Sequence, residues 1–433
     1  MTEKELFAAL KAFPGITSLN PMQQQAWGCR SAHICIISPT GSGKTLALGG
    51  ALLRRLGAPG RGPRAVVLTP SRELTLQVAD VLRRLGRGYK TAAFYGSHSM
   101  TDECGTLRGM PDIIVATPGR LLDHLQRGTL TPPERLDVLA VDEYDKALEL
   151  GFQDEMRRIV RRLGRPRNLI VTSATEGAVP DFIDMSEAEY ISGAEAPAPD
   201  IEIFHVESPA RDKLDTLYDL LRAIPSGKTI VFVNHRDAAE RVASGLRDRG
   251  IPAGLYHGGL EQQEREEAVI QLDNGSKPVL VSTDLGSRGL DIGGVEAVVH
   301  YHLPVSEQAW THRNGRTARA GASGSVYVIT SEADGIPEYV RTDHEYFPGE
   351  PRPAGPKPPV TLYIDAGRRE KISRADILGF LVKQAGLEPS EIGRIDLRDH
   401  RSYVAVPRTA LPAVAAVKGV KMKNKKVRIT PLK

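Results

Sequence analysis

One eight-residue stretch, Ser-Pro-Thr-Gly-Ser-Gly-Lys-Thr from Ser38 to Thr45, constrains the fold of this chain more than any other. An apolar run, Ile34 to Ile37, precedes it, and leucines at helical spacing follow it. Glycines let the backbone turn so tightly that successive amide N–H groups face one anion, and a helix start adds the positive end of its dipole. This order of strand, glycine turn and helix predicts a phosphate-binding loop.

The whole loop is a candidate nucleotide site, with the binding residues Ser38, Pro39, Thr40, Gly41, Ser42, Gly43, Lys44 and Thr45. Lys44 is expected to reach the β- and γ-phosphates of ATP and to be catalytic, and the Thr45 hydroxyl is expected to ligate Mg²⁺. Ser38 occupies the position that is glycine in the general pattern, so the assignment depends on the motifs that follow.

Short strands rich in Val, Ile and Leu alternate with amphipathic helices in two successive series. The first series of expected strands comprises Ile34–Ile37, Val66–Thr69, Ile113–Ala116, Val138–Val141 and Leu169–Thr172. The second series comprises Thr229–Val233, Gly254–His257, Val279–Ser282, Ala297–His300 and Val326–Ile329. Each series predicts a doubly wound parallel sheet whose ligand site lies at the carboxyl ends of the strands. A lapse in periodicity around 194–200 predicts a linker between them.

The C-terminal part differs in composition from the rest of the chain. A proline-rich stretch, 347–359, predicts a semi-rigid spacer. Beyond it, 360–433 reads as strand, helix, strand, strand, helix, strand, the split βαβ order of RNA-recognition folds. This segment has 16 Lys and Arg against 7 Asp and Glu, whereas the whole chain carries only +4. Such a basic module favours a polyanion partner over a merely solvated surface.

These patterns predict domains at 1–195 and 196–346, the spacer at 347–359 and a small module at 360–433. No stretch approaches eighteen apolar residues, and the chain starts without a basic leader or an apolar segment, which predicts a cytoplasmic protein without a membrane partner. The three cysteines form no C-x-x-C pair and are odd in number, so buried thiols are expected instead of disulfides.

Acidic side chains close one of the expected strands, at Val141-Asp-Glu-Tyr-Asp145. Nucleotide hydrolysis requires one carboxylate to hold Mg²⁺ and a second to orient or deprotonate the attacking water. Asp142 fits the first role and Glu143 the second. An acidic strand end can also be a solvated surface or a helix cap, but the phosphate loop upstream favours catalysis.

The second series of strands contains the arginine-rich stretch His312 to Arg319. Arg313, Arg316 and Arg319 recur every three residues, so several guanidinium groups are expected to project from one short surface. Arginine beside a transferring phosphoryl group neutralises charge in the transition state. The alternative is a basic helix face in ordinary salt bridges.

Nine motifs in sequence resemble the DEAD-box ATP-dependent RNA helicases over residues 1–345. They are Pro21–Gln23, Ser38–Thr45, Pro70–Leu74, Thr117–Arg120, Asp142–Asp145, Ser173–Thr175, Gln262–Arg265, Ser282–Asp291 and His312–Arg319. The resemblance implies that Gln23 reads the adenine and that Asp291 contacts the ribose. It implies that Ser173 and Thr175 couple the nucleotide site to RNA, and that Arg316 and Arg319 are arginine fingers. The residues implied along the RNA backbone are Arg72, Gly119, Arg120, Thr283 and Gly286.

Three positions depart from the family pattern. Tyr144 stands where alanine is usual, beside the coupling motif, although both catalytic carboxylates remain. Ile16 replaces an aromatic residue that stacks on adenine, so apolar packing is expected there. Ala318 replaces a glycine between the two fingers.

The C-terminal module looks like the RNA-binding domain of the DbpA-like branch of this family, in the segments 367–379, 392–396 and 402–406. In that branch the module grips a structured ribosomal RNA hairpin. Tyr403 is either a stacking aromatic or a core residue. Lys423, Lys425 and Lys426 lie in a tail without acidic residues and are expected to contact phosphates.

The sequence therefore predicts two tandem RecA-like α/β domains and a small α+β RRM-like module. The predicted protein is an ATP- and Mg²⁺-dependent RNA helicase that locally unwinds short duplexes. Its expected partner is RNA, 23S ribosomal RNA or pre-ribosomal particles during large-subunit assembly, and we expect a monomer. One rival is an ATP-gated RNA clamp or scaffold with little unwinding. A DNA translocase is disfavoured by the glutamine motif and the RNA-type module.

Overall fold

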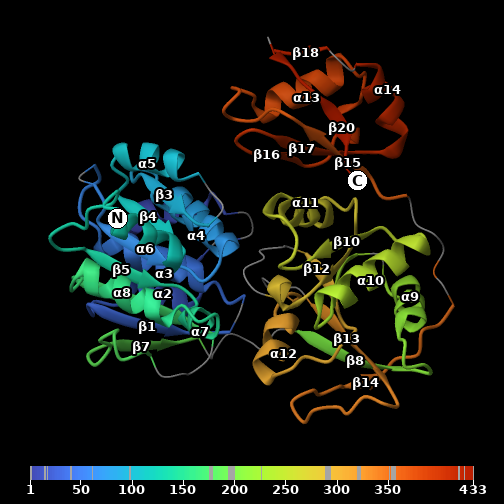
Figure 1. Ribbon diagram of the computed structural model, residues 1–433, viewed down its shortest axis with the longest axis horizontal. Helices are drawn as coiled ribbons and strands as arrows, with labels where there is room; N and C mark the ends of the chain where they lie inside the picture. The colour runs from blue at the N-terminus through green and yellow to red at the C-terminus, as the bar shows by residue number, and fades with distance from the viewer. Residues whose placement is uncertain are drawn as a thin grey trace. The chain divides into compact units, whose positions relative to one another are not determined.

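The computed structural model describes residues 2–13, 16, 18–39, 41–60, 62–96, 99–174, 179–193, 200–225, 227–287, 294–318, 323–350, 352, 357–417, 420–423 and 425–432 (Figure 1). These residues divide into two compact units, the first up to residue 193 and the second from residue 200 onward. None of the helices described is both long enough and apolar enough to cross a membrane.

The first unit is built on a seven-stranded, entirely parallel sheet. Its spatial order is β3 (Thr91–Phe94), β4 (Ile113–Ala116), β2 (Ala65–Leu68), β5 (Val138–Val141), β6 (Asn168–Ser173), β1 (His33–Ile37) and β7 (Glu189–Ser192). Every residue of β2, β4 and β5 is buried, as expected for parallel strands covered on both faces. In β1, Ile34 and Ile36 enter one core and Cys35 enters the other.

Helices cover both faces of this sheet. The helices of the first unit are α1 (Glu3–Leu10), α2 (Pro21–Gly28), α3 (Lys44–Arg55), α4 (Arg72–Leu85), α5 (Met100–Arg108), α6 (Pro118–Gln126), α7 (Tyr144–Glu149) and α8 (Gln153–Leu163). Apolar residues of α1 to α4 form the core on one face, and those of α6 to α8 form the core on the other. This double winding is the predicted architecture.

The second unit begins with another seven-stranded parallel sheet. Its order is β10 (Ala253–Tyr256), β11 (Val279–Ser282), β9 (Lys228–Phe232), β12 (Val295–His300), β13 (Gly324–Ser331), β8 (Ile201–Ser208) and β14 (His344–Glu345). Its helices are α9 (Leu214–Ala223), α10 (Arg236–Asp248), α11 (Gln262–Asp273), η1 (Asp284–Ser287) and α12 (Glu307–Asn314).

The C-terminal module belongs to the second unit and has an antiparallel sheet. Its order is β16 (Ile395–Leu397), β17 (Ser402–Val406), β15 (Val360–Ile364) and β20 (Ile429–Pro431). Its other elements are α13 (Arg374–Lys383), η2 (Pro389–Glu391), η3 (Arg408–Ala410), α14 (Leu411–Ala416) and the hairpin of β18 (Lys421–Met422) and β19 (Lys425–Lys426). The predicted split βαβ order is confirmed.

All the expected strands are present, and Ile113–Ala116, Val138–Val141 and Val279–Ser282 match to the residue. The strands β3, β7, β8 and β14 are not among those predicted from the sequence. Three of these contain small or exposed polar residues: β3 reads Thr-Ala-Ala-Phe, three of four residues of β7 are exposed, and β14 is exposed throughout. The expected linker around 194–200 lies outside the described residues except for its last position.

Candidate nucleotide and RNA site

The candidate catalytic residues of the first unit gather at one edge of its sheet. Because all the strands run parallel, their carboxyl ends share that edge. The phosphate loop follows β1, Asp142 follows β5, and Ser173 ends β6, so three adjacent strands carry the nucleotide candidates. Arg72 and Gly119 follow the neighbouring strands β2 and β4, which places the RNA candidates farther along the same edge.

Two glycines give the phosphate loop its shape. Gly41 and Gly43 have φ of 86° and 87°, a region that side chains other than glycine rarely adopt. A Cβ added to Gly43 would lie 2.3 Å from Gln23 Nε2, so the loop also requires glycine for close approach. Gln23 Nε2 donates to Gly43 O at 3.3 Å. Asn20, which caps α2, donates to Ser42 O at 2.9 Å. Gln23 is therefore tied to the loop, and its contact with adenine stays a prediction.

Lys44, the first residue of α3, is folded back onto the loop. Its Nζ donates to Pro39 O at 2.9 Å and also to Ser38 O. Burial lowers the pKa of Lys44 to about 8, although the charges of Glu143 and Asp142 oppose the shift. The ammonium group thus lies in a low-dielectric site facing two carboxylates.

Asp142 lies fully buried beside this lysine. Its Oδ1 accepts a hydrogen bond from Thr172 at 2.5 Å. Burial, followed by the charge of Glu143, raises the pKa of Asp142 to about 6. Its Oδ2 has no hydrogen-bond partner among the described residues, and the same holds for the buried hydroxyls of Ser38 and Ser42. Buried polar atoms without partners are costly unless a ligand satisfies them, so this site fits a polar ligand.

Glu143 is held in an unusual backbone conformation. Its φ of 52° and ψ of 54° place it in the left-handed region, which is strained for a residue other than glycine. Its backbone N–H donates to Thr172 Oγ1 at 3.0 Å, and Lys146 Nζ donates to its Oε2 at 3.1 Å. Thr172 and Lys146 are not among the site residues predicted from the sequence. Thr172 stands next to the Ser-Ala-Thr motif, and Lys146 follows Glu143 by three residues, the spacing of a helical ion pair.

Tyr144 is buried in the core formed by α6 to α8. Its hydroxyl is hydrogen-bonded to Ser173, and burial raises the pKa of this tyrosine. Asp145 Oδ2 accepts from Ala174 N at 3.2 Å, so α7 is joined to the end of β6 at a second point. Ile16 packs against the core on the opposite face.

Two RNA candidates of the first unit, Arg72 and Arg120, contact other side chains, whereas the third, Gly119, is exposed. The guanidinium of Arg72 lies 4.4 Å from the centroid of the Tyr95 ring. Arg120 Nε bonds to Glu103 Oε2 at 2.6 Å, and the same oxygen lies 2.8 Å from His124 Nε2. Gly119 is exposed at the start of α6, whose N-cap Thr117 makes no side-chain capping bond. Uncapped N–H groups at a helix start suit a phosphate.

The second unit corrects one prediction about the arginine stretch. Arg313 does not project from the surface: it is fully buried, and its Nε donates to Asp284 Oδ1 at 2.5 Å. Its other nitrogens donate to His302 O and Asn234 Oδ1, both at 2.8 Å. Periodicity alone cannot show this, because the partners come from distant loops. Arg316 is also buried, at 4% exposed. Thr283 and Gly286 form a turn at the start of η1, with Gly286 N donating to Thr283 O at 2.9 Å.

Four predicted site residues lie outside the described part of the chain: Thr40, Thr175, Asp291 and Arg319. Their roles remain predictions. Pro39 and Thr45 are described, and Thr45 is half-buried as the second residue of α3.

Tyr403 is buried in the C-terminal module, with 0% of its surface exposed. Its hydroxyl donates to Glu267 Oε1 on α11 at 3.0 Å. Its ring is therefore buried on the side of β17 that contacts α11, and it is not among the residues that form the apolar core of the module. Lys425 and Lys426 are exposed on β19, and Lys423 Nζ donates to Asp376 Oδ2 at 2.9 Å.

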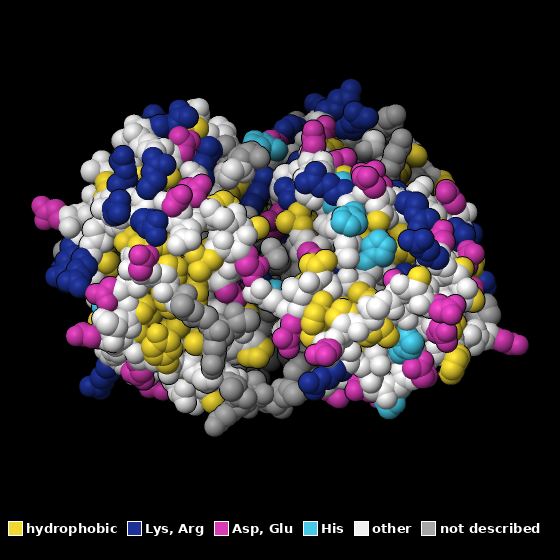
Figure 2. Space-filling view, turned by 60° about the horizontal axis from the view of Figure 1, so that its bottom comes forward, with side chains coloured by type: hydrophobic (Ala, Val, Ile, Leu, Met, Phe, Trp, Pro, Cys, Tyr) yellow, Lys and Arg dark blue, Asp and Glu magenta, His cyan; other side chains and the backbone are white. Residues whose placement is uncertain are grey.

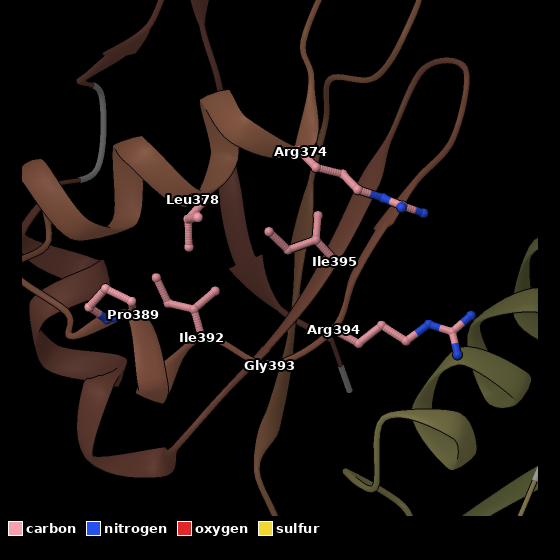
Figure 3. Close-up of a pocket in the computed structure, with 7 residues that line it drawn as sticks. All are labelled: Arg374, Leu378, Pro389, Ile392, Gly393, Arg394 and Ile395. Carbon is pink, nitrogen blue, oxygen red and sulfur yellow. The ribbon is translucent and has the colours of Figure 1, made fainter. Parts of the chain in front are cut away.

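A pocket of about 570 Å³ opens in the module between α13 and β16 (Figure 3). It is lined by Arg374, Leu378, Pro389, Ile392, Gly393, Arg394 and Ile395. In Figure 3 the aliphatic side chains lie together while both arginines extend to the same side. Arg394 forms ion pairs with Asp273 and Asp396. The guanidinium of Arg374 beside the apolar patch suits an unstacked base with its phosphate. The sequence analysis did not single out this group.

Family models match three parts of the chain. The DEAD/DEAH box helicase model matches residues 20–181, the helicase conserved C-terminal domain matches residues 212–321, and the DbpA RNA binding domain matches residues 361–431. The three matches follow the same order along the chain as the two parallel sheets and the antiparallel module.

Curated relatives match along nearly the whole chain. ATP-dependent RNA helicase DbpA of Escherichia coli (strain K12) is 33% identical over 437 residues, covering 97% of this chain and 95% of the relative. DbpA of Bacillus subtilis (strain 168) is 29% identical over 466 residues, covering 97% and 96%. The solved structure of S. cerevisiae Dbp5 bound to RNA and ADP BeF3 matches with a TM-score of 0.65 and 25% identity, covering 76% of this chain and 87% of that chain. The expected fold of two RecA-like domains is confirmed.

Proposed function

The chain belongs to the DEAD-box ATP-dependent RNA helicases of the DbpA type, and from this premise we propose that it unwinds short duplexes in ribosomal RNA during large-subunit assembly. The observation that carries the helicase chemistry is the group of Lys44, Asp142 and Glu143 at one edge of the first sheet. The ribosomal target rests on the resemblance of the C-terminal module and on its excess of basic residues.

The described residues fit ATP with Mg²⁺. Lys44 and the loop N–H groups would bind the phosphates, and Thr45 and Asp142 would hold the cation, which neutralises phosphate charge. No group of three or more His, Cys, Asp or Glu suited to a metal occurs in the described part of the chain. The cation would therefore take its remaining ligands from phosphate oxygens and water, as Mg²⁺ commonly does. Glu143, placed by its strained backbone and by Lys146, would orient the attacking water.

The RNA would bind along the carboxyl edge of the first sheet and through the module. Gly119 and the start of α6 would accept a phosphate, and Arg120 would contribute charge. In the module, Lys425, Lys426 and the pocket near Arg374 are the exposed candidates for a ribosomal hairpin. Such a tether holds the helicase close to its substrate, which raises the effective concentration of the duplex to be opened.

The test compares ATP hydrolysis with no RNA, with unstructured RNA, and with a ribosomal RNA fragment that contains the peptidyl-transferase region. The proposal predicts that the fragment stimulates turnover at much lower concentration than unstructured RNA does. Equal stimulation by both RNAs would contradict the ribosomal target while leaving a general helicase.

A second candidate function, an ATP-gated RNA clamp, is favoured by one observation. Tyr144 forms a buried hydrogen bond with Ser173, a residue expected to couple hydrolysis to RNA. If this bond prevents coupling, the protein binds RNA in the presence of ATP without separating strands. A strand-displacement assay distinguishes the two, because a clamp retains the labelled strand and a helicase releases it.

A further inference from the structure

A second pocket lies in the first unit, at the sheet edge opposite the nucleotide site. Its lining includes the starts of β1, β5 and β6 and the loops that precede them. The cavity measures about 660 Å³, within the range of small-ligand sites. We propose that this pocket is an additional RNA-binding site that engages a segment of RNA distinct from the one at the carboxyl edge.

Arginine dominates the charge of this pocket. The stretch 157–167 contains six arginines and no acidic residue. Arg161, Arg165 and Arg167 from this stretch line the cavity, and Arg135 joins them from the loop before β5. Gly164, with φ of 69°, ends α8 and turns the chain so that arginines lie on both sides of the turn. In Figure 2 Lys and Arg side chains are drawn in dark blue, and several of them lie on the face of the molecule shown there.

Part of this charge is free to meet a ligand. Arg165 pairs with Asp184 at 2.9 Å, and Arg167 Nε lies 3.6 Å from Asp137 Oδ1. Arg135 and Arg161 are exposed, and neither forms an ion pair with a residue that the structure describes. Two acidic residues, Asp184 and Glu187, line the pocket against four arginines, so the lining is net positive.

The floor of the pocket favours nucleic acid over a simple anion. It is formed by Leu139, Val160, Leu169, Phe182 and Ile183. Phe182 is half-buried, and the guanidinium of Arg157 lies 5.3 Å from its ring centroid. Aromatic rings and guanidinium planes are the surfaces on which unpaired bases stack, and arginine also binds phosphate in bidentate fashion. The cations of the lining are arginines and none is a lysine. The planar guanidinium of arginine can stack on a base, which the ammonium group of lysine cannot do.

Geometry determines which RNAs this site can engage. The six residues of β6 separate the two edges by about 20 Å, at about 3.3 Å per residue. A strand that fills the carboxyl edge needs further nucleotides to run around the domain to the arginine pocket. The site therefore acts on long RNA and leaves short oligonucleotides unaffected.

The test compares RNA affinity of the full-length chain with that of Arg135→Glu combined with Arg161→Glu. For RNA of about sixty nucleotides, the double variant should bind about tenfold more weakly at low salt. The negative slope of log affinity against log salt should become shallower by about 1.5. RNA of about ten nucleotides should bind as before and should stimulate ATP hydrolysis as before. The matched control is Arg87→Glu with Arg108→Glu, two exposed arginines of the same unit, which should change long-RNA affinity less than twofold.

Two results would overturn the site. One is long-RNA affinity unchanged in the pocket variant, and the other is an equal loss in both double variants, which would mean general electrostatics. Binding of an acidic peptide that is lost in the pocket variant while long-RNA affinity persists would reassign the pocket to a protein partner.

The inference rests on the proposed function only for the identity of the ligand as RNA. Wild-type protein without RNA-stimulated hydrolysis would refute that function, whereas normal hydrolysis with unchanged long-RNA affinity refutes the pocket alone.

Discussion

The hydroxyl of Tyr144 is hydrogen-bonded to Ser173, which joins the first residue of α7 to the last residue of β6. The tyrosine is 1% exposed, so water does not compete for this bond. A buried hydrogen bond of this kind contributes about 1 kcal/mol. The family resemblance implies that Ser173 couples the nucleotide site to RNA. If this coupling requires Ser173 to change partners, the tyrosine opposes that change by about the same amount.

We therefore expect Tyr144→Phe to raise the RNA-stimulated turnover of ATP by about fivefold, the equivalent of about 1 kcal/mol. The same change should lower the free energy of unfolding by about 1 kcal/mol, because the hydrogen bond between the tyrosine hydroxyl and Ser173 is lost while the ring still fills the core. Turnover at saturating RNA and denaturant unfolding measure the two effects.

Tyr327→Phe is the matched control for this experiment. Tyr327 is also buried, its hydroxyl is hydrogen-bonded to Ser325, and it lies in the second unit. The control should lose stability to a similar extent without gaining turnover. A gain in both variants, or in neither, contradicts the role assigned to Tyr144.

Lys44→Ala and Glu143→Gln should each reduce ATP turnover by at least about a hundredfold. The first removes the cation expected at the phosphates, and the second removes the carboxylate expected to orient water. Glu149→Gln, at the end of the same helix as Lys146, serves as the control and should retain parental turnover. Normal hydrolysis in Lys44→Ala or Glu143→Gln would invalidate the active-site assignment.

The second unit should lose stability as the pH falls below about 6.5, the ordinary pKa of histidine. Burial and the neighbouring charge of Arg313 lower the pKa of His300 to about 3, although its hydrogen bond with Asn314 opposes this. Between these values the unfolded chain binds a proton that the native chain does not, so the native state is favoured less as pH falls. From pH 6.5 to 5 the loss is about 2 kcal/mol.

His300→Gln tests this linkage through the pH dependence of unfolding, whatever its effect on stability at neutral pH. The variant should lose about 2 kcal/mol less than the parent over that interval. If the free energy of unfolding of His300→Gln depends on pH as that of the parent does, another group causes the loss of stability at acidic pH.

In the C-terminal module, charge reversal should affect RNA more than loss of the tyrosine hydroxyl. Tyr403→Phe should leave hairpin affinity within about twofold, because its ring is buried and its hydroxyl bonds to Glu267. Lys425→Glu with Lys426→Glu should weaken binding by about tenfold at low salt, since both side chains are exposed. Filter binding of a ribosomal hairpin measures both. A large loss in Tyr403→Phe alone would restore the stacking role.

The sheet strands and the edge carrying the chemistry could be predicted because they depend on local patterns. A run such as Val138–Val141 can satisfy its backbone and bury both faces only in a covered sheet, and parallel pairing then brings Asp142 to the edge where the phosphate loop ends. The polar strand β8, Ile-Glu-Ile-Phe-His-Val-Glu-Ser, lacks that signature and was missed.

The contacts that refine the site could not be predicted in the same way. Thr172 bonds to both Asp142 and the backbone of Glu143 across the pairing of β5 with β6, and only the folded register brings them together. The spacing of Arg313 predicted a surface position, yet its guanidinium is buried and bonds to Asp284 of η1 and to Asn234 of the loop after β9. Contacts between residues that lie far apart in the sequence produce no periodic pattern from which they could be predicted.

The position of Lys44 has a consequence for how the protein selects among nucleotides. Its ammonium group already donates hydrogen bonds to the carbonyls of Ser38 and Pro39. Nucleotide binding therefore replaces these hydrogen bonds with hydrogen bonds to phosphate oxygens. Calorimetry would report only the difference between those two sets. A nucleoside monophosphate offers nothing to replace the carbonyls. The loop therefore discriminates against nucleotides that lack β- and γ-phosphates, because its own lysine must give up these hydrogen bonds when a nucleotide binds.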